Sequence, residues 1–127
     1  VFGDENFHHL DIEAERPRTT DITVISATLE HLNRYSNALN NIRESTTKMV
    51  CIRTFIGQTS LSDWCLKPGA EAPYLIRQFR IADIENYFPD WGLTIYSDRA
   101  TLGVKKNVCS EGKEIMRTQS ILLFTSP

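Results

Sequence analysis

The chain has 127 residues, of which 41% are hydrophobic and 24% are charged, and its formal net charge at pH 7 is -2. This composition is ordinary for one soluble globular domain and excludes wholesale disorder. Acidic residues slightly outnumber basic ones, which argues against nucleic acid as a partner of this domain, because phosphate binding needs clustered Lys and Arg side chains.

The first twenty residues carry few apolar side chains in any periodic order. We expect residues 1–20 to form a polar arm or linker, followed by a single domain over residues 21–127. His8 and His9 stand among acidic residues of this arm. A solvated arm lacks the fixed geometry of a ligand shell, so no metal site is predicted, while metal binding and pH sensing by the two histidines stay open alternatives.

Residues 21–45 carry apolar side chains at steps of three and four residues, which places them on one face of a long helix. The members of this stripe are Ile22, Ile25, Leu29, Leu32, Tyr35, Leu39 and Ile42. The spacing is not a strict heptad, so we predict that the helix covers a sheet of its own chain and does not join a coiled coil. His31 falls beside the stripe and is expected to be a boundary residue, not a catalytic one.

The middle of the chain alternates between predicted strands, one long loop and a short helix. Apolar residues on both alternating faces predict an inner strand over residues 49–56. Residues 57–73 are expected to form a long loop with a single helical turn at residues 60–63. An extended entry then leads into a short helix over residues 81–88, which Pro89 must end.

Three more strands are predicted over residues 93–97, 101–108 and 115–124. Sequential strands joined by short turns pair as an antiparallel meander. The predicted fold class is therefore α+β, with a long amphipathic N-terminal helix packed on a small, mainly antiparallel sheet and one further short helix.

The three cysteines bear on the compartment. Cys65 and Cys109 lie in polar, turn-like segments, whereas Cys51 lies in the middle of a predicted strand. We expect a disulfide between Cys65 and Cys109, which is one of three possible pairings, and a free thiol at Cys51. A disulfide favours an oxidising compartment, so the expected location is extracytoplasmic, and periplasmic in a bacterium.

Catalytic signatures are absent from the sequence. The histidines stand on the arm and in the long predicted helix, and no GxSxG, glycine-rich phosphate loop, HExxH or calcium-loop spacing occurs. Acid pairs such as Asp83 with Glu85 fall on a predicted helix surface, where solvated acids are expected. We therefore predict no cofactor, no metal and no enzymatic activity.

The predicted function is a non-enzymatic extracytoplasmic sensory or protein-interaction domain of a membrane-anchored protein. The chain begins without Met, so we expect contact with a membrane only through a missing upstream segment. In outline, a long helix over a small antiparallel sheet with late cysteines is similar to extracytoplasmic domains of membrane-anchored bacterial regulators or of minor pilin-like proteins, which implies signalling and virulence regulation. The alternative is a small cytosolic binding module such as an immunity protein or antitoxin.

The expected partner is another protein or a second copy of the chain. Trp64 in the long loop and Trp91 in the Pro-Asp-Trp-Gly turn are the candidate anchors, although packing against the core is the alternative for both. Tyr96 and Arg99 near the predicted hairpin end would supply a polar rim. An open strand at the sheet edge could add a strand of the partner.

Overall fold

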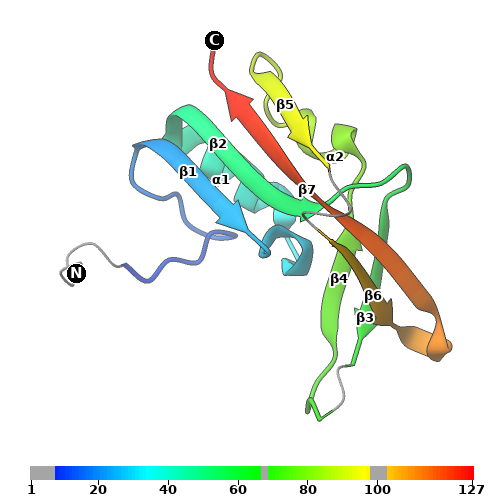
Figure 1. The fold of residues 1–127 in the computed structure, drawn as a ribbon. Coiled ribbons are helices and arrows are strands. Elements are labelled where there is room, and N and C mark those ends of the chain that lie inside the picture. Colours follow the sequence, from blue (N-terminus) through cyan, green and yellow to red (C-terminus); the bar gives the residue numbers. More distant parts are fainter. Residues whose placement is uncertain (1–7, 67–68, 98–102) are drawn as a thin grey trace, which may run out of the picture.

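The computed structural model describes residues 8–66, 69–97 and 103–127, and Figure 1 shows a curved mixed sheet of five strands with a separate two-stranded hairpin below it. The elements in chain order are β1 (Thr20–Ser26), η2 (Leu29–His31), α1 (Tyr35–Ser45), β2 (Thr46–Phe55), β3 (Leu61–Cys65), β4 (Tyr74–Gln78), α2 (Ile81–Glu85), β5 (Gly92–Tyr96), β6 (Val104–Val108), η3 (Ser110–Gly112) and β7 (Glu114–Thr125). No helix of the described chain has the length and apolar character needed to span a membrane.

The main sheet has the strand order β1-β2-β7-β5. β1 runs parallel to β2, and β7 runs antiparallel to both of its neighbours β2 and β5. β1, β2 and β5 therefore point the same way, with β7 reversed among them. The first half of β7 extends beyond these strands and pairs antiparallel with β6, the fifth strand of the sheet.

The long helix predicted over residues 21–45 is wrong. The segment forms the strand β1, the short 3-10 helix η2 and the 11-residue helix α1. Thr, Ile and Val alternate through β1, and their branched side chains favour a strand. Ala27 then takes a φ of 52°, which interrupts the chain before η2. The apolar spacing misled the prediction because Ile22, Ile25 and Leu29 fit a helix stripe even though the segment contains a strand and a turn.

The predicted antiparallel meander is also wrong. β5 and β6 do not pair with each other in the described chain; both pair with β7, one after the other along its length. β7 is 12 residues long, which gives it room for two consecutive partners on one edge while β2 holds the other. The predicted loop over residues 57–73 contains β3, which pairs with β4, and the helical turn expected at residues 60–63 lies partly in that strand.

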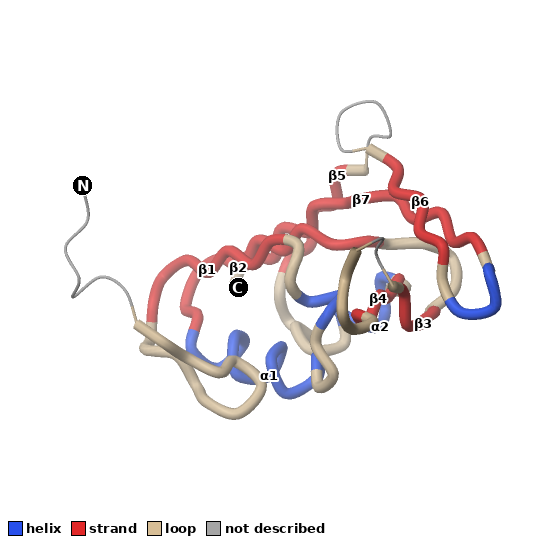
Figure 2. Tube along the Cα trace, turned by 90° about the horizontal axis from the view of Figure 1, so that it is seen from below, coloured by secondary structure: helices blue, strands red, loops and turns tan. Residues whose placement is uncertain are grey.

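One face of the sheet carries the core. α1 lies beneath the sheet in Figure 2, and its buried residues pack with Val50 and Ile52 of β2 and with Phe124 of β7. Phe88 stacks on Phe124 with ring centroids 4.3 Å apart and meets the edge of Trp91 at 5.5 Å. Pro89 follows Phe88, and α2 ends before it at Glu85.

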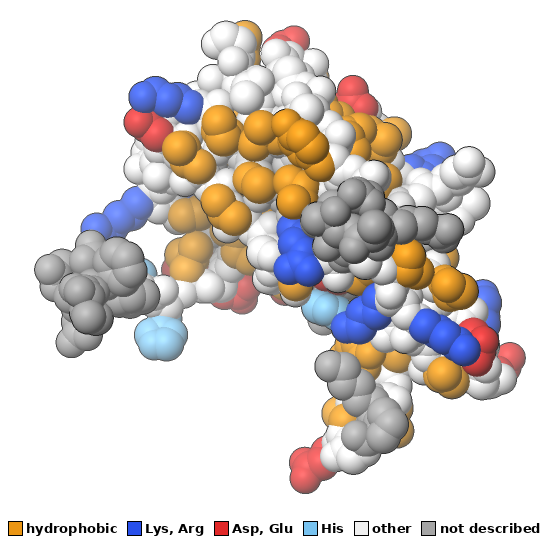
Figure 3. All heavy atoms as spheres, in the orientation of Figure 1, with side chains coloured by type: hydrophobic (Ala, Val, Ile, Leu, Met, Phe, Trp, Pro, Cys, Tyr) orange, Lys and Arg blue, Asp and Glu red, His pale blue; other side chains and the backbone are white. Residues whose placement is uncertain are grey.

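The opposite face of the sheet is apolar and has no helix over it in the described part of the chain. Ile22 and Val24 of β1 are 54% and 68% exposed, and the strand register places them beside Met49 and Cys51 of β2. Figure 3 shows hydrophobic side chains gathered over β1, β2 and β7 on this face. Parallel strands are normally covered on both faces, so this surface is unusual for a sheet with a parallel pair.

Asp83 closes the first turn of α2 and makes this helix sensitive to acid. Its carboxylate accepts hydrogen bonds from the Arg80 backbone N–H at 2.8 Å, from the Arg80 guanidinium at 3.1 Å and from the Ser60 hydroxyl. Partial burial works to raise the pKa of Asp83, but the bonds from Ser60 and Arg80 outweigh it and the pKa lies below the ordinary value of 3.8. The ionised form is therefore the one that the folded state favours.

We expect Asp83→Asn to lower the free energy of unfolding by about 1 kcal/mol at pH 7, the usual effect of losing a helix cap. Because the folded pKa is depressed, this contribution is present above the unfolded pKa near 3.8 and is lost as the pH falls through the folded value. Urea unfolding at pH 7 and at steps down to pH 3 measures it. Glu85→Gln on the same helix is the control, and an Asp83→Asn effect that stays constant with pH would contradict the assignment.

Candidate functional site

A small pocket of about 70 Å³ lies at the carboxyl ends of β1 and β2. Ligands of open α/β sheets bind at this end of the strands. β1 ends at Ser26, the positive φ of Ala27 turns the chain, and η2 then presents two ionisable side chains. The lining side chains that carry chemistry are Glu30, His31, Arg53, Thr54, Lys105 and Gln119.

Glu30 is a fully buried acid in this lining, with 1% of its surface exposed. Thr54 donates a hydrogen bond to Glu30 Oε2 at 3.0 Å. Burial lowers the pKa of Arg117, and the nearby negative charge of Glu30 works to raise it. Arginine stays protonated in proteins, so Arg117 supplies a positive charge near Glu30.

Arg117 is itself fully buried and anchors a polar network. It donates to the Arg77 carbonyl at 2.9 Å and to Asn107 Oδ1 at 3.0 Å, and its guanidinium lies 3.8 Å from the centre of the Phe55 ring. Asn107 in turn donates to the Tyr74 hydroxyl at 2.9 Å. The network links β7, β6 and β4, which are separate in the chain, and holds Tyr74 in place.

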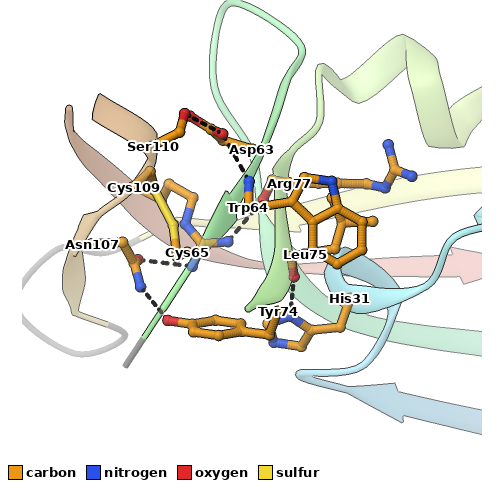
Figure 4. Close-up of a disulfide and its surroundings, with 11 residues drawn as sticks. His31, Asp63, Trp64, Cys65, Tyr74, Leu75, Arg77, Asn107, Cys109 and Ser110 are labelled. Carbon is orange, nitrogen blue, oxygen red and sulfur yellow. Dashed lines mark hydrogen bonds between the residues drawn. A yellow bond between two sulfur atoms is a disulfide. The ribbon is translucent and has the colours of Figure 1, made fainter. Parts of the chain in front are cut away.

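His31 is held in one tautomer. Its Nδ1 lies 2.6 Å from the Leu75 carbonyl oxygen, and a carbonyl can only accept, so Nδ1 carries the proton. The other ring nitrogen, Nε2, is then left with a lone pair that can accept a proton. The rings of His31 and Tyr74 lie 5.8 Å apart, and Figure 4 shows Tyr74 between His31 and Asn107.

A larger groove of about 590 Å³ lies beside this pocket, between the β3–β4 hairpin and β6. Its lining includes Leu66, Tyr74, Lys105, Asn107, Val108 and Cys109. Lys105 lines both the pocket and the groove. The disulfide between Cys65 and Cys109 ties the end of β3 to the end of β6, with the two Cα atoms 4.3 Å apart, and so joins the two walls of the groove.

The residues predicted to anchor a partner are not gathered at this site. Trp64 lies half exposed on β3, whereas Trp91 packs against the core beside Phe88. Tyr96 is exposed at the end of β5, and Arg99 lies outside the described residues. Their proposed binding roles stay predictions. Cys51 is a half-buried free thiol, and the described chain holds no cluster of three or more His, Cys, Asp or Glu side chains that could bind a metal ion.

Sequence reasoning missed Glu30, His31 and Lys105. A long helix over residues 21–45 would place Glu30 on its polar face and His31 at the boundary, but both residues lie in the short 3-10 helix η2. The signal that could have found Glu30 and His31 is the alternation of β-branched residues in the segment before Ala27, since a strand there brings the residues after it to a carboxyl end.

Some solved structures have a similar fold. TehB from Haemophilus influenzae matches 98% of this chain and 43% of its own, with a TM-score of 0.58 and 17% sequence identity. Magnesium protoporphyrin IX methyltransferase (ChlM) from Synechocystis PCC 6803 with bound SAM (S-adenosylmethionine) matches 93% of this chain and 44% of its own, with a TM-score of 0.52 and 10% identity. The same protein with bound SAH (S-adenosylhomocysteine) matches 93% of this chain and 49% of its own, with a TM-score of 0.53 and 13% identity.

This likeness concerns the fold, and the chain spans less than half the length of these proteins. No protein-family model and no curated protein matches the sequence. The likeness contradicts the predicted non-enzymatic sensory domain, together with its alternative of an immunity protein or antitoxin, because the fold is shared with a methyltransferase. It also contradicts the prediction that the chain is not an enzyme. The expected protein partner or homodimer and the extracytoplasmic location stay predictions.

Proposed function

We propose that this chain is the acceptor-binding part of an enzyme that methylates a small molecule, and that His31 takes the proton which the acceptor group loses. The observation that supports this most directly is the orientation of His31. Its Nδ1 is committed to the Leu75 carbonyl, so Nε2 is available as a base at the carboxyl end of two parallel strands. The fold is similar to that of a methyltransferase with bound SAM.

The described residues do not by themselves form a site for SAM. The pocket at the carboxyl ends is about 70 Å³, whereas ligand pockets measure roughly 300–1,000 Å³. The six glycines of the sequence include no GxG spacing, which is the usual phosphate-loop and dinucleotide signature of such folds. SAM, the source of the methyl group, would therefore have to be held mainly by residues outside this chain.

The uncovered surface of the sheet offers a place for those residues. The outer edge of β1 has no partner strand in the described chain, and its residues Ile22 and Val24 are exposed. A further parallel strand beside β1, with a helix over the apolar face, would bury this surface and place new loops next to the pocket. In this proposal the two parts share one sheet.

Binding of SAM to the full-length protein tests the proposal. Isothermal titration calorimetry with SAM and with SAH is expected to show saturable binding of both. A full-length protein that binds neither would overturn the proposed function.

The role of His31 has its own test in the same protein. We expect His31→Ala to leave SAM binding unchanged. The same variant should lower the rate of SAH formation from SAM by about 10²-fold or more. A small-molecule metabolite extract serves as the source of the acceptor in this assay. His9→Ala, an exposed histidine of the arm, is the control and should change neither quantity. If His31→Ala retained the full rate across pH 6–9, a range that covers the usual titration of His, His31 would not be the base.

A further inference from the structure

We infer that the acceptor is a small apolar molecule that carries a carboxylate, and that it binds in the groove between the β3–β4 hairpin and β6 with its anionic group on Lys105. The identity of the ligand as a methyl acceptor rests on the proposed function; the groove and its preference for an apolar anion do not. Four features of the described chain carry the inference.

The size and the apolar walls of the groove suit a small organic molecule. Its volume of about 590 Å³ falls within the usual range for ligand pockets. Leu66 enters from the hairpin side and Val108 from β6, and these two side chains are 58% and 56% exposed. The ring of Tyr74 supplies a further apolar surface. A ligand with an apolar body would remove these side chains from water.

The positive charge of Lys105 has no acidic partner in the described chain. Lys106 forms an ion pair with Glu114 at 3.0 Å, but Lys105 forms none within the described chain. Glu30, the acid of the adjoining pocket, has the positive charge of Arg117 nearby. Arg53 is bound to the neutral amide of Gln119, so it adds positive charge to the same pocket. The balance at this end of the groove is therefore positive, which favours an anion.

The pairing of β6 with β7 also favours an anion at Lys105. Lys105 stands directly opposite Arg117 across β6 and β7. Like charges directly opposite each other in a sheet are destabilising. An anion bound at Lys105 would offset that repulsion.

The groove also leads to the proposed base. Lys105 lines both the pocket and the groove. Tyr74 lines the groove, and the centroid of its ring lies 5.8 Å from that of the His31 ring. The bond from Asn107 fixes the Tyr74 hydroxyl on the groove side. A molecule anchored by its carboxylate at Lys105 can therefore extend its other end past Tyr74 toward His31.

Calorimetric titration of the full-length protein with 2-naphthoate, and with the neutral 2-naphthalenemethanol of similar shape, tests the inference. We expect 2-naphthoate to bind at least tenfold more tightly than the alcohol. Lys105→Ala should raise the Kd of 2-naphthoate about tenfold and change that of the alcohol less than about twofold, because only the naphthoate loses a charge-assisted bond. Lys105→Arg should retain binding to within about threefold, and Lys48→Ala, which removes an exposed lysine of β2 paired with Asp21, should have no effect.

Backbone amide chemical shifts place the bound probe. Shifts concentrated at residues 105–109 and at Tyr74 are expected, whereas shifts concentrated on Ile22 and Val24 would mean binding to the open sheet face and would overturn the inference. Equal affinity for the two probes, or a Kd for naphthoate unchanged by Lys105→Ala, would also overturn it. Naphthoate binding without SAM binding would support the groove assignment and overturn the proposed function. SAM binding without naphthoate binding would support the proposed function and overturn the groove assignment.

Discussion

We expect replacement of Arg117 by Met to lower the free energy of unfolding by about 2–5 kcal/mol, because each buried hydrogen-bonding group left without its partner costs roughly 1–3 kcal/mol. Arg117 is fully buried, and Met fills a similar volume, so lost packing contributes little. The Asn107 oxygen and the Arg77 carbonyl are left without a donor. The negative charge of Glu30, which is 1% exposed, also loses a nearby positive charge.

Urea unfolding of the variant measures this loss. Arg16→Met is the matched control, because Arg16 pairs with Glu44 on the surface and its removal should change stability by less than about 0.5 kcal/mol. The double variant Arg117→Met with Glu30→Gln should recover a large part of the loss, since the uncompensated charge is gone. A loss below about 1 kcal/mol for Arg117→Met alone would show that Arg117 does not hold this network, and no recovery in the double variant would show that the charge of Glu30 contributes nothing to the loss.

Loss of the link between Cys65 and Cys109 is expected to lower the free energy of unfolding by about 3–4 kcal/mol in the chain-entropy model, because the bond closes a 44-residue separation. The double variant Cys65→Ser with Cys109→Ser and the chemically reduced protein should agree. Cys51→Ala, which removes the free thiol, is the control. The bond also joins the walls of the groove, so we expect the same variant to weaken binding of 2-naphthoate.

Mass mapping of non-reduced peptides checks the bond directly. A cross-linked peptide pair containing Cys65 and Cys109 is the expected product. Three free thiols would remove both the stability effect and the main support for an oxidising compartment.

Short-range features were predictable from the residues alone. The short helix predicted over residues 81–88 exists as α2, but it ends at Glu85, before Pro89. Runs of alternating or continuous apolar residues marked the strands near residues 49–56, 93–97 and 115–124, which lie in or overlap β2, β5 and β7. The strand predictions succeed because side-chain alternation depends on neighbours within a few positions.

Residues 20–45 show where a local pattern misleads. The apolar steps of three and four fit a helix, yet Thr20–Ser26 is a strand because β2 lies alongside as a parallel partner. A helix over this segment would place Glu30 on a solvated face. In the structure it is buried, because the turn at Ala27 directs η2 back against Thr54 and toward Arg117.

The sequence by itself determined the composition of a globular domain, the stretches near β2, β5 and β7 that form strands, and the presence of a short helix after residue 80. Only the tertiary structure decided that β7 runs between β2 and β5, because strand partners depend on which distant segments bury each other's faces. It also decided the site. Glu30, His31, Lys105 and Arg117 come from η2, β6 and β7, and no spacing in the sequence records their proximity, which arises only when β6 and the carboxyl ends of β1 and β2 meet.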